Sequence, residues 1–533
     1  MPSPRLMTVV RLVLAAFAAL AAFAAEALTA DQVRAMAAGE NDDRAAAIAA
    51  AAASGDPQAP AFLQALLDDA VRTAGDKVFV VRDGKAVDAA SGAPATLPAD
   101  AEDVVNSNRM RREIESALAS LKLLSPDAAQ RAAASRELRD GADEARLPLI
   151  EKAWTAETDA ALKAELGLLR ASVLIGAAER GKRLEAAHTL AASDSPAIRA
   201  LLLERLKPEA ETDPEVRGRL QLALQSIESR LAWGERLGVA FTGVSLGSVL
   251  LLVALGLAIT YGLMGVINMA HGELMMIGAY ATWLVQNAFR SALPAYFDWY
   301  ILAAVPAAFL ASALVGAVLE RGVIRFLYGR PLETLLATWG ISLVLMQAVR
   351  SLFGAQNVQV ENPAWLSGGV AAMSNLTLPF NRIAIIAFAA LVLAALALLV
   401  ARTRLGLFVR GVTQNRPMAS CMGVNTARVD TYAFALGSGI AGLAGCALSQ
   451  VGNVGPDLGQ GYIVDAFMVV VLGGVGQLAG TVYAALGLGV LNKLLEGWQG
   501  AVLAKITVLV LIVVFIQKRP QGLFAMKGRS AEG

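Results

Sequence analysis

The sequence predicts an all-α protein in two parts: a polytopic transmembrane helix bundle of about eight or nine spans, preceded by an exported α-helical domain. Hydrophobic residues make up 56% of the 533 residues and the mean hydropathy is +0.53, which is too apolar for a soluble enzyme. Yet 35 of the 45 acidic residues lie before Leu237, so the first part is charged like a soluble domain. Apolar stretches of spanning length follow one another only after that residue.

The first 25 residues are expected to form a secretory signal peptide. Arg5 and Arg11 precede an apolar run of about 13 residues, and Ala22 and Ala24 form a small-residue cleavage pattern. The run is short for a spanning helix, which needs ~20 apolar residues. The alternative is that this segment is an uncleaved membrane anchor. In either case, the domain that follows is expected to be exported. We therefore expect a signal peptide at 1–25, an exported helical domain at 26–236, a transmembrane domain at 237–517 and a cytoplasmic tail at 518–533.

The expected exported domain is rich in alanine, leucine and charged residues with helical spacing, and its segments resemble one another. The segment that starts at Arg131 resembles the one that starts at Arg183, and the sequence Glu-Thr-Asp at 157–159 recurs at 211–213. A weaker copy starts at Arg44. Repeated helix pairs of this kind are typical of HEAT-like solenoids, which need about three copies for a continuous core.

Two short motifs in this domain need an interpretation. Residues 77–92 predict a β-hairpin, because Asp83-Gly84 between two apolar runs favours a type I′ turn. Residues 176–182 match the first seven positions of a phosphate-binding P-loop, but Arg183 replaces the Ser or Thr that would hold magnesium. No strand is expected before this loop, so we interpret it as part of the helical repeat.

Nine apolar stretches are candidates for membrane spans, and the two after Val464 are short enough to be one broken span or a re-entrant pair. Basic residues gather at 321–330, 402–428 and 518–529, which should face the cytoplasm. An exported domain followed by a cytoplasmic C-terminus requires an odd number of spans, which nine satisfies. The stretches lie near 241–260, 262–286, 300–320, 334–353, 382–401, 429–450, 464–477, 479–495 and 501–517.

Composition argues against several classes of chemistry. The net charge of +1 gives no sign of a nucleic-acid partner. Two cysteines, Cys421 and Cys446, and two histidines, His188 and His271, are too few for a disulfide framework or a zinc site. We therefore expect no enzyme, no catalytic residues, no metal and no cofactor. The sequence Gly-x-Gly-x-x-Gly at 437–442 lies inside an apolar stretch, so it indicates close helix packing rather than a dinucleotide site.

Three polar side chains, Asn268, His271 and Glu273, interrupt an apolar run that is long enough to cross a bilayer. Polar groups at that depth are costly unless they are paired or line a cavity. On a continuous helix, Asn268 and His271 would share one face with Met264 and Met275, and Glu273 would point away from them. They either line a translocation path or form hydrogen bonds that assemble the bundle.

The run from Gly256 to Thr282 resembles the signature of the permease subunits of branched-chain amino acid type ABC importers. The resemblance continues through 412–430 and 469–489, so it covers about residues 238–525. The residues from Thr413 to Arg416 and the long N-terminal extension are most similar to the urea permease subunit. The resemblance implies a polytopic importer subunit for urea, or alternatively for branched-chain amino acids.

The resemblance also implies a short helix that receives the ATPase. In the family's coupling loop, Glu-Ala-Ala is followed by Gly after three intervening residues; Ala419 matches the second alanine and Gly423 the glycine. Pro417 and Met418 depart from the Glu and the first Ala, and proline suits the first turn of a helix. Methionines would supply adaptable apolar contacts. The coupling residues that we expect are Arg416, Met418, Ala419, Met422 and Gly423.

A dense glycine segment follows in the region of resemblance, at Gly473, Gly474, Gly476 and Gly480. Glycines at this density weaken a helix, and unwound backbone in a membrane is tolerated only where protein or water surrounds it. The segment either serves translocation or allows close packing.

The resemblance implies a set of partners and a mechanism. The partners would be a second permease subunit, two cytoplasmic ATPase subunits, an exported solute-binding protein and a small neutral solute. The protein would lie in the inner membrane, with its N-terminal domain exported and its C-terminus cytoplasmic, and would move solute by alternating access. An alternative of another class is an exported sensor or scaffold domain tethered to a non-transporting bundle.

Overall fold

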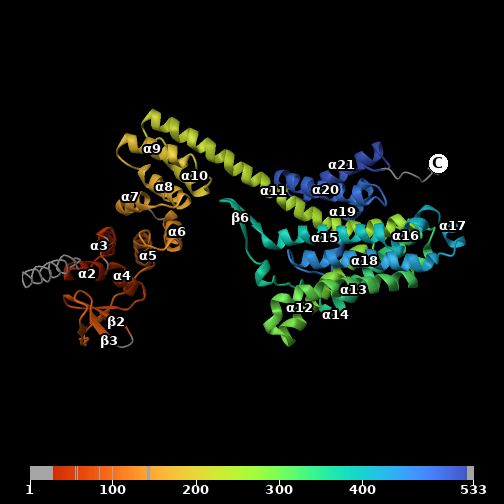
Figure 1. The fold of residues 1–533 in the computed structure, drawn as a ribbon, viewed down its shortest axis with the longest axis horizontal. Coiled ribbons are helices and arrows are strands. Elements are labelled where there is room, and N and C mark those ends of the chain that lie inside the picture. Colours follow the sequence, from red (N-terminus) through yellow and green to blue (C-terminus); the bar gives the residue numbers. More distant parts are fainter. Residues whose placement is uncertain are drawn as a thin grey trace, which may run out of the picture. The chain divides into compact units, whose positions relative to one another are not determined.

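The computed structural model describes residues 28–524, except 55, 57, 83, 84, 99 and 141–143. The expected signal peptide at 1–25 therefore lies outside the described residues. The chain divides into two compact units, Met1–Leu231 and Ala232–Gly533, which we call the N-terminal unit and the membrane unit. The long helix α11 (Pro214–Met264) contributes residues to both units (Figure 1).

Helices dominate the N-terminal unit, in agreement with the sequence prediction. Several start at a side-chain cap; for example, Ser107 accepts a hydrogen bond from the amide of Met110, and Asp159 accepts from Ala161. Before α11, the described helices are α2 (Ala30–Ala37), α3 (Asn41–Ser54), α4 (Ala59–Leu67), α5 (Asn108–Lys122), α6 (Ala128–Glu137), α7 (Leu147–Ala156), α8 (Ala160–Leu174), α9 (Arg180–Leu190) and α10 (Pro196–Arg205), with short 3-10 turns η1 (Leu138–Asp140) and η2 (Glu144–Arg146).

The predicted hairpin is present, and it belongs to a larger sheet. Strands β2 (Lys77–Arg82) and β3 (Lys85–Asp88) pair antiparallel with Arg82 opposite Lys85, while the two turn residues lie outside the described residues. The sheet has five strands in the order β4-β3-β2-β1-β5. The sequence did not predict the other three, because strands this short leave no alternating pattern. They are β1 (Val71–Ala74), β4 (Pro94–Ala95) and β5 (Glu102–Asp103).

The internal repeat is visible as two equivalent ion pairs. Arg131 pairs with Glu157, and Arg183 pairs with Glu211, each with an N–O distance of 2.8 Å. Each arginine also donates to the carbonyl groups five and six positions before it. Each glutamate accepts from the amide two positions after it. The copy that starts at Arg44 departs from this pattern, because that arginine donates to an asparagine and to backbone carbonyls.

The first of these pairs predicts a pH dependence of stability. The hydrogen bond from Arg131, with those from the amides of Asp159 and Thr158, lowers the pKa of Glu157 from 4.5 to about 2. A carboxyl whose pKa is depressed by folding stabilises the fold above its unfolded pKa, and this stabilisation is lost as the pH falls through the folded value. We expect the protection factors of the amides in α6 and α8, which correct exchange rates for the slower intrinsic exchange at low pH, to fall as the pH falls from 4.5 toward 2.

The matched variant is Glu157→Gln, which keeps the shape of the side chain and removes its titration. In that variant, the stability of α6 and α8 should be lower at neutral pH and should depend less on pH over the same interval. A parallel loss of stability in both proteins would show that other groups cause the pH dependence.

The membrane unit is an all-α polytopic bundle, as expected. Seven helices among the described residues are long and apolar enough to cross a membrane: α11, α13 (Tyr300–Gly322, joined to the 3-10 turn η3, Pro294–Trp299), α14 (Pro331–Phe353), α15 (Phe380–Arg402), α18 (Thr426–Ser449), α20 (Leu478–Gln499) and α21 (Ala501–Lys518). Helix α19 (Leu458–Gly473) is apolar but shorter, and α12 (His271–Ala292) is long enough but less apolar. The remaining elements are α16 (Arg404–Gln414), α17 (Arg416–Cys421), η4 (Ile324–Leu327), η5 (Ala364–Leu366) and the hairpin β6 (Gly369–Met373)–β7 (Leu376–Pro379).

Helix α18 forms the centre of the bundle and is buried along most of its length. Its glycines lie against three neighbouring helices. A Cβ at Gly437 would meet the backbone of α11, one at Gly442 would meet Ser312 of α13, and one at Gly445 would meet Met275 of α12. The Gly-x-Gly-x-x-Gly sequence is therefore a packing motif, as predicted.

Basic residues gather at one end of the membrane unit, which we call the arginine-rich end. This end carries η4, α16 and α17, and Figure 1 shows α16 and α17 at the same end as the last described residues. The clustering is the one that the sequence predicted for a cytoplasmic face. The residues are Arg321, Arg325, Arg330, Arg402, Arg404, Arg410, Arg416, Arg428, Lys518 and Arg519.

Candidate functional site

A break between α11 and α12 carries the first candidate site. Helix α11 ends at Met264, Gly265 has a positive φ of 65°, and α12 begins only at His271. The prediction of one continuous helix here is therefore wrong, and Asn268 does not share a helical face with His271. The backbone of the break is held from α14, where the Thr338 hydroxyl accepts from the Met269 amide at 3.2 Å.

The break lies inside the bundle rather than in a surface loop. The His271 side chain reaches the carbonyl oxygen of Val253, a residue 11 positions before the end of α11. At 1.5 Å per helical residue, that is about 16 Å from the end of the helix. The segment after Gly265 therefore runs back into the bundle in a non-helical conformation before α12 starts. Unwound backbone at this depth is a recurring feature of solute sites in transporters.

Asn268 and His271 are almost completely buried, and each has one satisfied and one unsatisfied polar atom. Asn268 Oδ1 accepts from the amide of Ala270 at 3.0 Å, while its Nδ2 has no hydrogen-bond partner in the described part of the chain. His271 Nε2 lies 3.1 Å from the Val253 carbonyl oxygen, so Nε2 carries the proton and donates it. Nδ1 is then a free acceptor among the described residues.

Glu273 points to a different helix, as the sequence predicted. Its Oε1 accepts from the Ser342 hydroxyl of α14 at 2.9 Å, whereas His271 contacts α11. Within the described residues, its Oε2 has no hydrogen-bond partner and the side chain is buried. Buried polar atoms are normally satisfied, so this group of unpaired donors and acceptors is unusual. The unpaired atoms belong to three residues within positions 268–273, at the break and the start of α12.

The residues of α14 that hold this site were not predicted from the sequence. Thr334, Thr338 and Ser342 are buried and spaced four apart, which places them on one helical face toward the break. Their spacing could have predicted this role, because small polar residues four positions apart within an apolar stretch mark a contact face between membrane helices.

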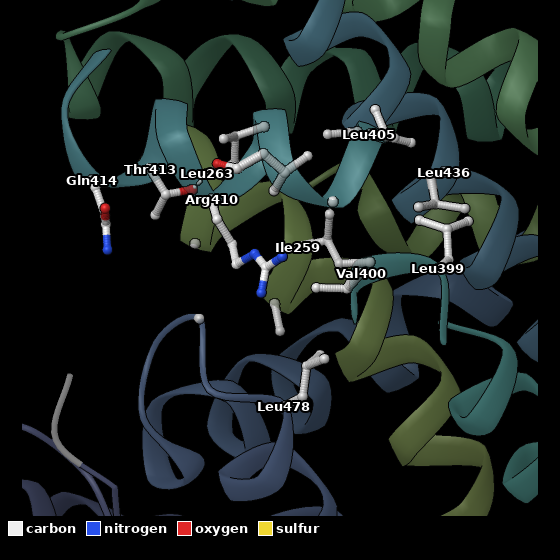
Figure 2. Close-up of a pocket in the computed structure, with 16 residues that line it drawn as sticks. Ile259, Leu263, Leu399, Val400, Leu405, Arg410, Thr413, Gln414, Leu436 and Leu478 are labelled. Atoms are coloured by element: carbon white, nitrogen blue, oxygen red, sulfur yellow. Dashed lines mark hydrogen bonds between the residues drawn. The ribbon is translucent and has the colours of Figure 1, made fainter. Parts of the chain in front are cut away.

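A pocket lies elsewhere in the membrane unit, at the arginine-rich end. It has a volume of about 460 Å³, and α11, α15, α16, α18 and the start of α20 line it (Figure 2). Figure 2 shows the Arg410 side chain pointing from α16 across the pocket toward Leu478. Asn268, His271 and Glu273 do not line this pocket. The buried polar break and this pocket are therefore separate places in the membrane unit.

The glycine segment forms the turn between α19 and α20. Gly474 and Gly476 have positive φ angles of 98° and 77°, while Gly473 ends α19 and Gly480 lies in the first turn of α20. Gly473 and Gly480 touch through their backbones, and the turn packs against the chain near Gly522. Only Gly476 of the four lines the pocket. Gly474 and Gly476 are thus non-helical, as expected for an unwound segment, whereas Gly473 and Gly480 allow α19 and α20 to pack closely.

A short helix, α17, forms at the residues where the coupling loop was expected. Asn415 caps its start by accepting from the amide of Met418, and Gly423 ends it with a positive φ of 83°. Met418 and Met422 are 60% and 78% exposed, so this helix presents apolar side chains on the surface of the membrane unit. Ala419 packs toward Val412 and Val429 of the neighbouring helices.

Arg416, also expected at the coupling site, forms an ion pair with the buried Asp430 of α18. No role was predicted for Asp430 from the sequence. The pair anchors α17 to the central helix while its methionines remain exposed.

A helix bundle with a polar break at its centre and an exposed apolar helix at its basic end has the architecture of a membrane permease. The family model for the permease component of the branched-chain amino acid transport system matches residues 239–517. The chain belongs to this family. The match begins after the N-terminal unit, which it does not cover.

Individual relatives agree with this assignment. The chain is 31% identical to the high-affinity branched-chain amino acid transport system permease protein LivH of Salmonella typhimurium, over 53% of this chain and 93% of that protein. It is 28% identical to the corresponding protein BraD of Pseudomonas aeruginosa, with the same coverage of both chains. No solved structure matches the chain. The protein is therefore a permease component of the branched-chain amino acid ABC transporter type, and its relatives are transport subunits rather than enzymes.

Proposed function

We propose that this permease imports a small neutral amide, with urea as the first candidate, and moves it through the break between α11 and α12. The observation that carries the proposal is the group of buried, unpaired polar atoms on Asn268, His271 and Glu273. Urea is planar and uncharged, with N–H donors and one carbonyl acceptor, so it complements an amide, an imidazole nitrogen and a carboxylate oxygen.

The charges of the bundle support a neutral solute. Between residues 232 and 524, no lysine or arginine is among the buried residues that the structure describes. An amino-acid zwitterion gains from fixed charges of both signs, whereas urea needs only hydrogen bonds. The sequence from Thr413 to Arg416 resembles that of urea permease subunits, which also favours urea as the solute.

Transport is driven from outside this chain in our proposal. Of two cytoplasmic ATPase subunits, one docks on α17. A second permease subunit completes the path, and an exported solute-binding protein delivers the solute. Closure of the ATPases on ATP shifts the bundle between its outward-open and inward-open states. The HEAT-like repeats of the N-terminal unit offer a surface for docking the solute-binding protein.

This arrangement predicts a topology. A reporter that is active only in the cytoplasm should be active when fused after Arg330 or Arg416 and silent after Gly92 or Glu361, because the arginine-rich end faces the cytoplasm. Arg330 and Arg416 lie at the arginine-rich end, and Gly92 lies in the N-terminal unit. An active fusion after Gly92 would contradict export of that unit.

The path residues predict a second outcome. Asn268→Leu and His271→Leu remove hydrogen-bonding groups from the break, so each should lower urea uptake by a factor of about ten or more, equivalent to ~1.4 kcal/mol or more. Glu273→Gln keeps the shape of the side chain and its acceptor toward Ser342, so its effect should be smaller. Initial uptake rates should be measured at equal amounts of folded protein in the membrane.

These variants also test the alternative that the polar groups at the break only hold the bundle together. If the leucine variants fail to assemble, the polar groups serve to hold the bundle together. If they assemble and transport normally, the path does not pass through the break. Thr260→Val is a matched control, because it removes a buried hydroxyl that bonds only carbonyls of its own helix.

Branched-chain amino acids are the second candidate solute, and the transport function of the LivH and BraD relatives favours them. Uptake of labelled urea and labelled leucine in the same cells, with the chain present or deleted, separates the two. Loss of urea uptake alone on deletion supports our proposal, and loss of leucine uptake alone supports the second. Deletion without effect on either supports a tethered sensor or scaffold.

A further inference from the structure

Two carboxylates are completely buried at the arginine-rich end, Glu320 of α13 and Asp430 of α18. Buried charges are unfavourable unless opposite charges and hydrogen bonds compensate them. Asp430 accepts from both terminal nitrogens of Arg416 on α17. Glu320 lies 3.5 Å from Arg325 of η4. Each carboxylate is thus paired with an arginine from another element.

Tyr328, between η4 and α14, connects these two pairs. The Arg416 guanidinium lies over its ring, with 5.0 Å between the guanidinium carbon and the ring centroid. Its hydroxyl lies 3.1 Å from Glu320 Oε1 and donates to it. The residue next to Asp430 closes the network, because the Thr431 hydroxyl donates to Glu320 Oε2 at 2.6 Å.

The same tyrosine also touches the start of the break. Its hydroxyl oxygen lies 2.9 Å from the sulfur of Met264, the last residue of α11. A hydroxyl has one proton, so it donates to the carboxylate, which is the stronger acceptor, and the sulfur packs against the oxygen. Tyr328 and Met264 also pack against the apolar cluster of Val266, Ile324 and Phe434, and Val266 lies directly after the positive-φ Gly265.

The exposure of the paired groups indicates which part can move. Arg416 and Arg325 are each 38% exposed, whereas both carboxylates are inaccessible. If α17 shifts without α18, Asp430 loses its partner in a buried environment. A displacement of α17 must therefore move α18 with it, because the alternative leaves the buried Asp430 charge without its partner. The ion pair thus couples the two helices stiffly.

We infer that Tyr328, held between Arg416 and Glu320, transmits the displacement of α17 to the break at residues 265–270. Tyr328 is a positioning residue in this role, since it acts through Arg416, Glu320 and Met264. The inference rests on the proposed function, in which α17 receives the ATPase and the break carries the solute.

The test is Tyr328→Phe in the complete complex reconstituted in vesicles. The variant keeps the ring under Arg416 and removes only the hydroxyl that meets Glu320 and Met264. We expect solute transported per ATP hydrolysed to fall about tenfold, the scale of one lost hydrogen bond to a charged group. Association with the ATPase should be unchanged, as measured by protection of the exposed Cys421 from a thiol reagent. Tyr432→Phe, which alters an exposed tyrosine of α18, should behave like the wild type.

A second set of variants guards against misfolding. Arg416→Asp and Asp430→Arg should each abolish uptake, and the double exchange should restore part of it, because it re-forms the pair in reverse. A normal ratio of transport to hydrolysis in Tyr328→Phe would overturn the inference. Loss of Cys421 protection in that variant would also overturn it, since Tyr328 would then only hold α17 in place. If the wild-type complex hydrolyses ATP without moving solute, the proposed function itself fails.

Discussion

Replacing the exposed Met418 of α17 and Met422 at its end with glutamate should abolish solute uptake while the permease remains folded in the membrane. Met418 and Met422 are among the most exposed apolar side chains of the arginine-rich end, and their neighbours in α17 are not buried. A hot-spot residue of a protein interface contributes about 2 kcal/mol or more, so two charged replacements should weaken ATPase binding by a factor of about 30 at least.

The measurement is co-purification of the ATPase with the permease, together with protection of Cys421. The matched control is Met418→Leu with Met422→Leu, which keeps the apolar surface and should keep uptake. Both variants leave the Arg416–Asp430 pair and the Gly423 turn intact. Normal association of the glutamate variant with the ATPase would show that the coupling surface lies elsewhere on the chain.

Gly445→Ala should destabilise the bundle strongly, although alanine is the better helix former by about 1 kcal/mol. A Cβ at Gly445 would fall onto the carbonyl oxygen of Met275 and lie 2.9 Å from the amide nitrogen of Ala279, so α12 would have to move away from α18. Overpacking of a close-packed interior costs about 1–3 kcal/mol, and a backbone contact gives little room for relief.

The matched control for this change is Gly487→Ala in α20, where an added Cβ would meet no atom within 4 Å. The two variants make the same chemical change inside a helix, so their difference isolates the close contact. Thermal unfolding in detergent and the yield of monodisperse protein measure it. Equal behaviour of the two alanine variants would contradict the close packing of α12 on α18.

Several features were predictable from local sequence because their causes are local. The cap at Asn415, the proline in the first turn and the positive-φ Gly423 fix α17 within nine residues. The repeat in the N-terminal unit was visible for the same reason, since Arg131 and Glu157 recur as Arg183 and Glu211. The glycine spacing of α18 similarly predicted close helix packing.

The break after Met264 was not predicted, because its surroundings are apolar enough to resemble a continuous span. The local signal was Gly265 followed by two β-branched residues and Asn268, all of which weaken a helix. What stabilises the break is tertiary: Thr338 of α14 bonds its backbone, and Val253 of α11 bonds His271. Contacts between residues that are 18 and 69 positions apart do not appear in a local pattern.

The buried network around Glu320 and Asp430 was missed for a related reason. Both residues lie near the ends of apolar spans, where a charged side chain normally reaches water. The fold instead brings Arg416 of α17 to Asp430 and Arg325 of η4 to Glu320. Only the arrangement of the helices reveals that Tyr328 lies between them.

The most direct test of the proposed function is ATP-driven uptake by the purified complex. Vesicles that contain the permease subunits, the ATPases and the solute-binding protein should accumulate labelled urea when ATP reaches the ATPase side. Complexes that carry the glutamate variant of α17 should not. Urea accumulation that is equal with and without this chain, or unaffected by ATP, would contradict the claim that it forms the solute path of an ABC importer.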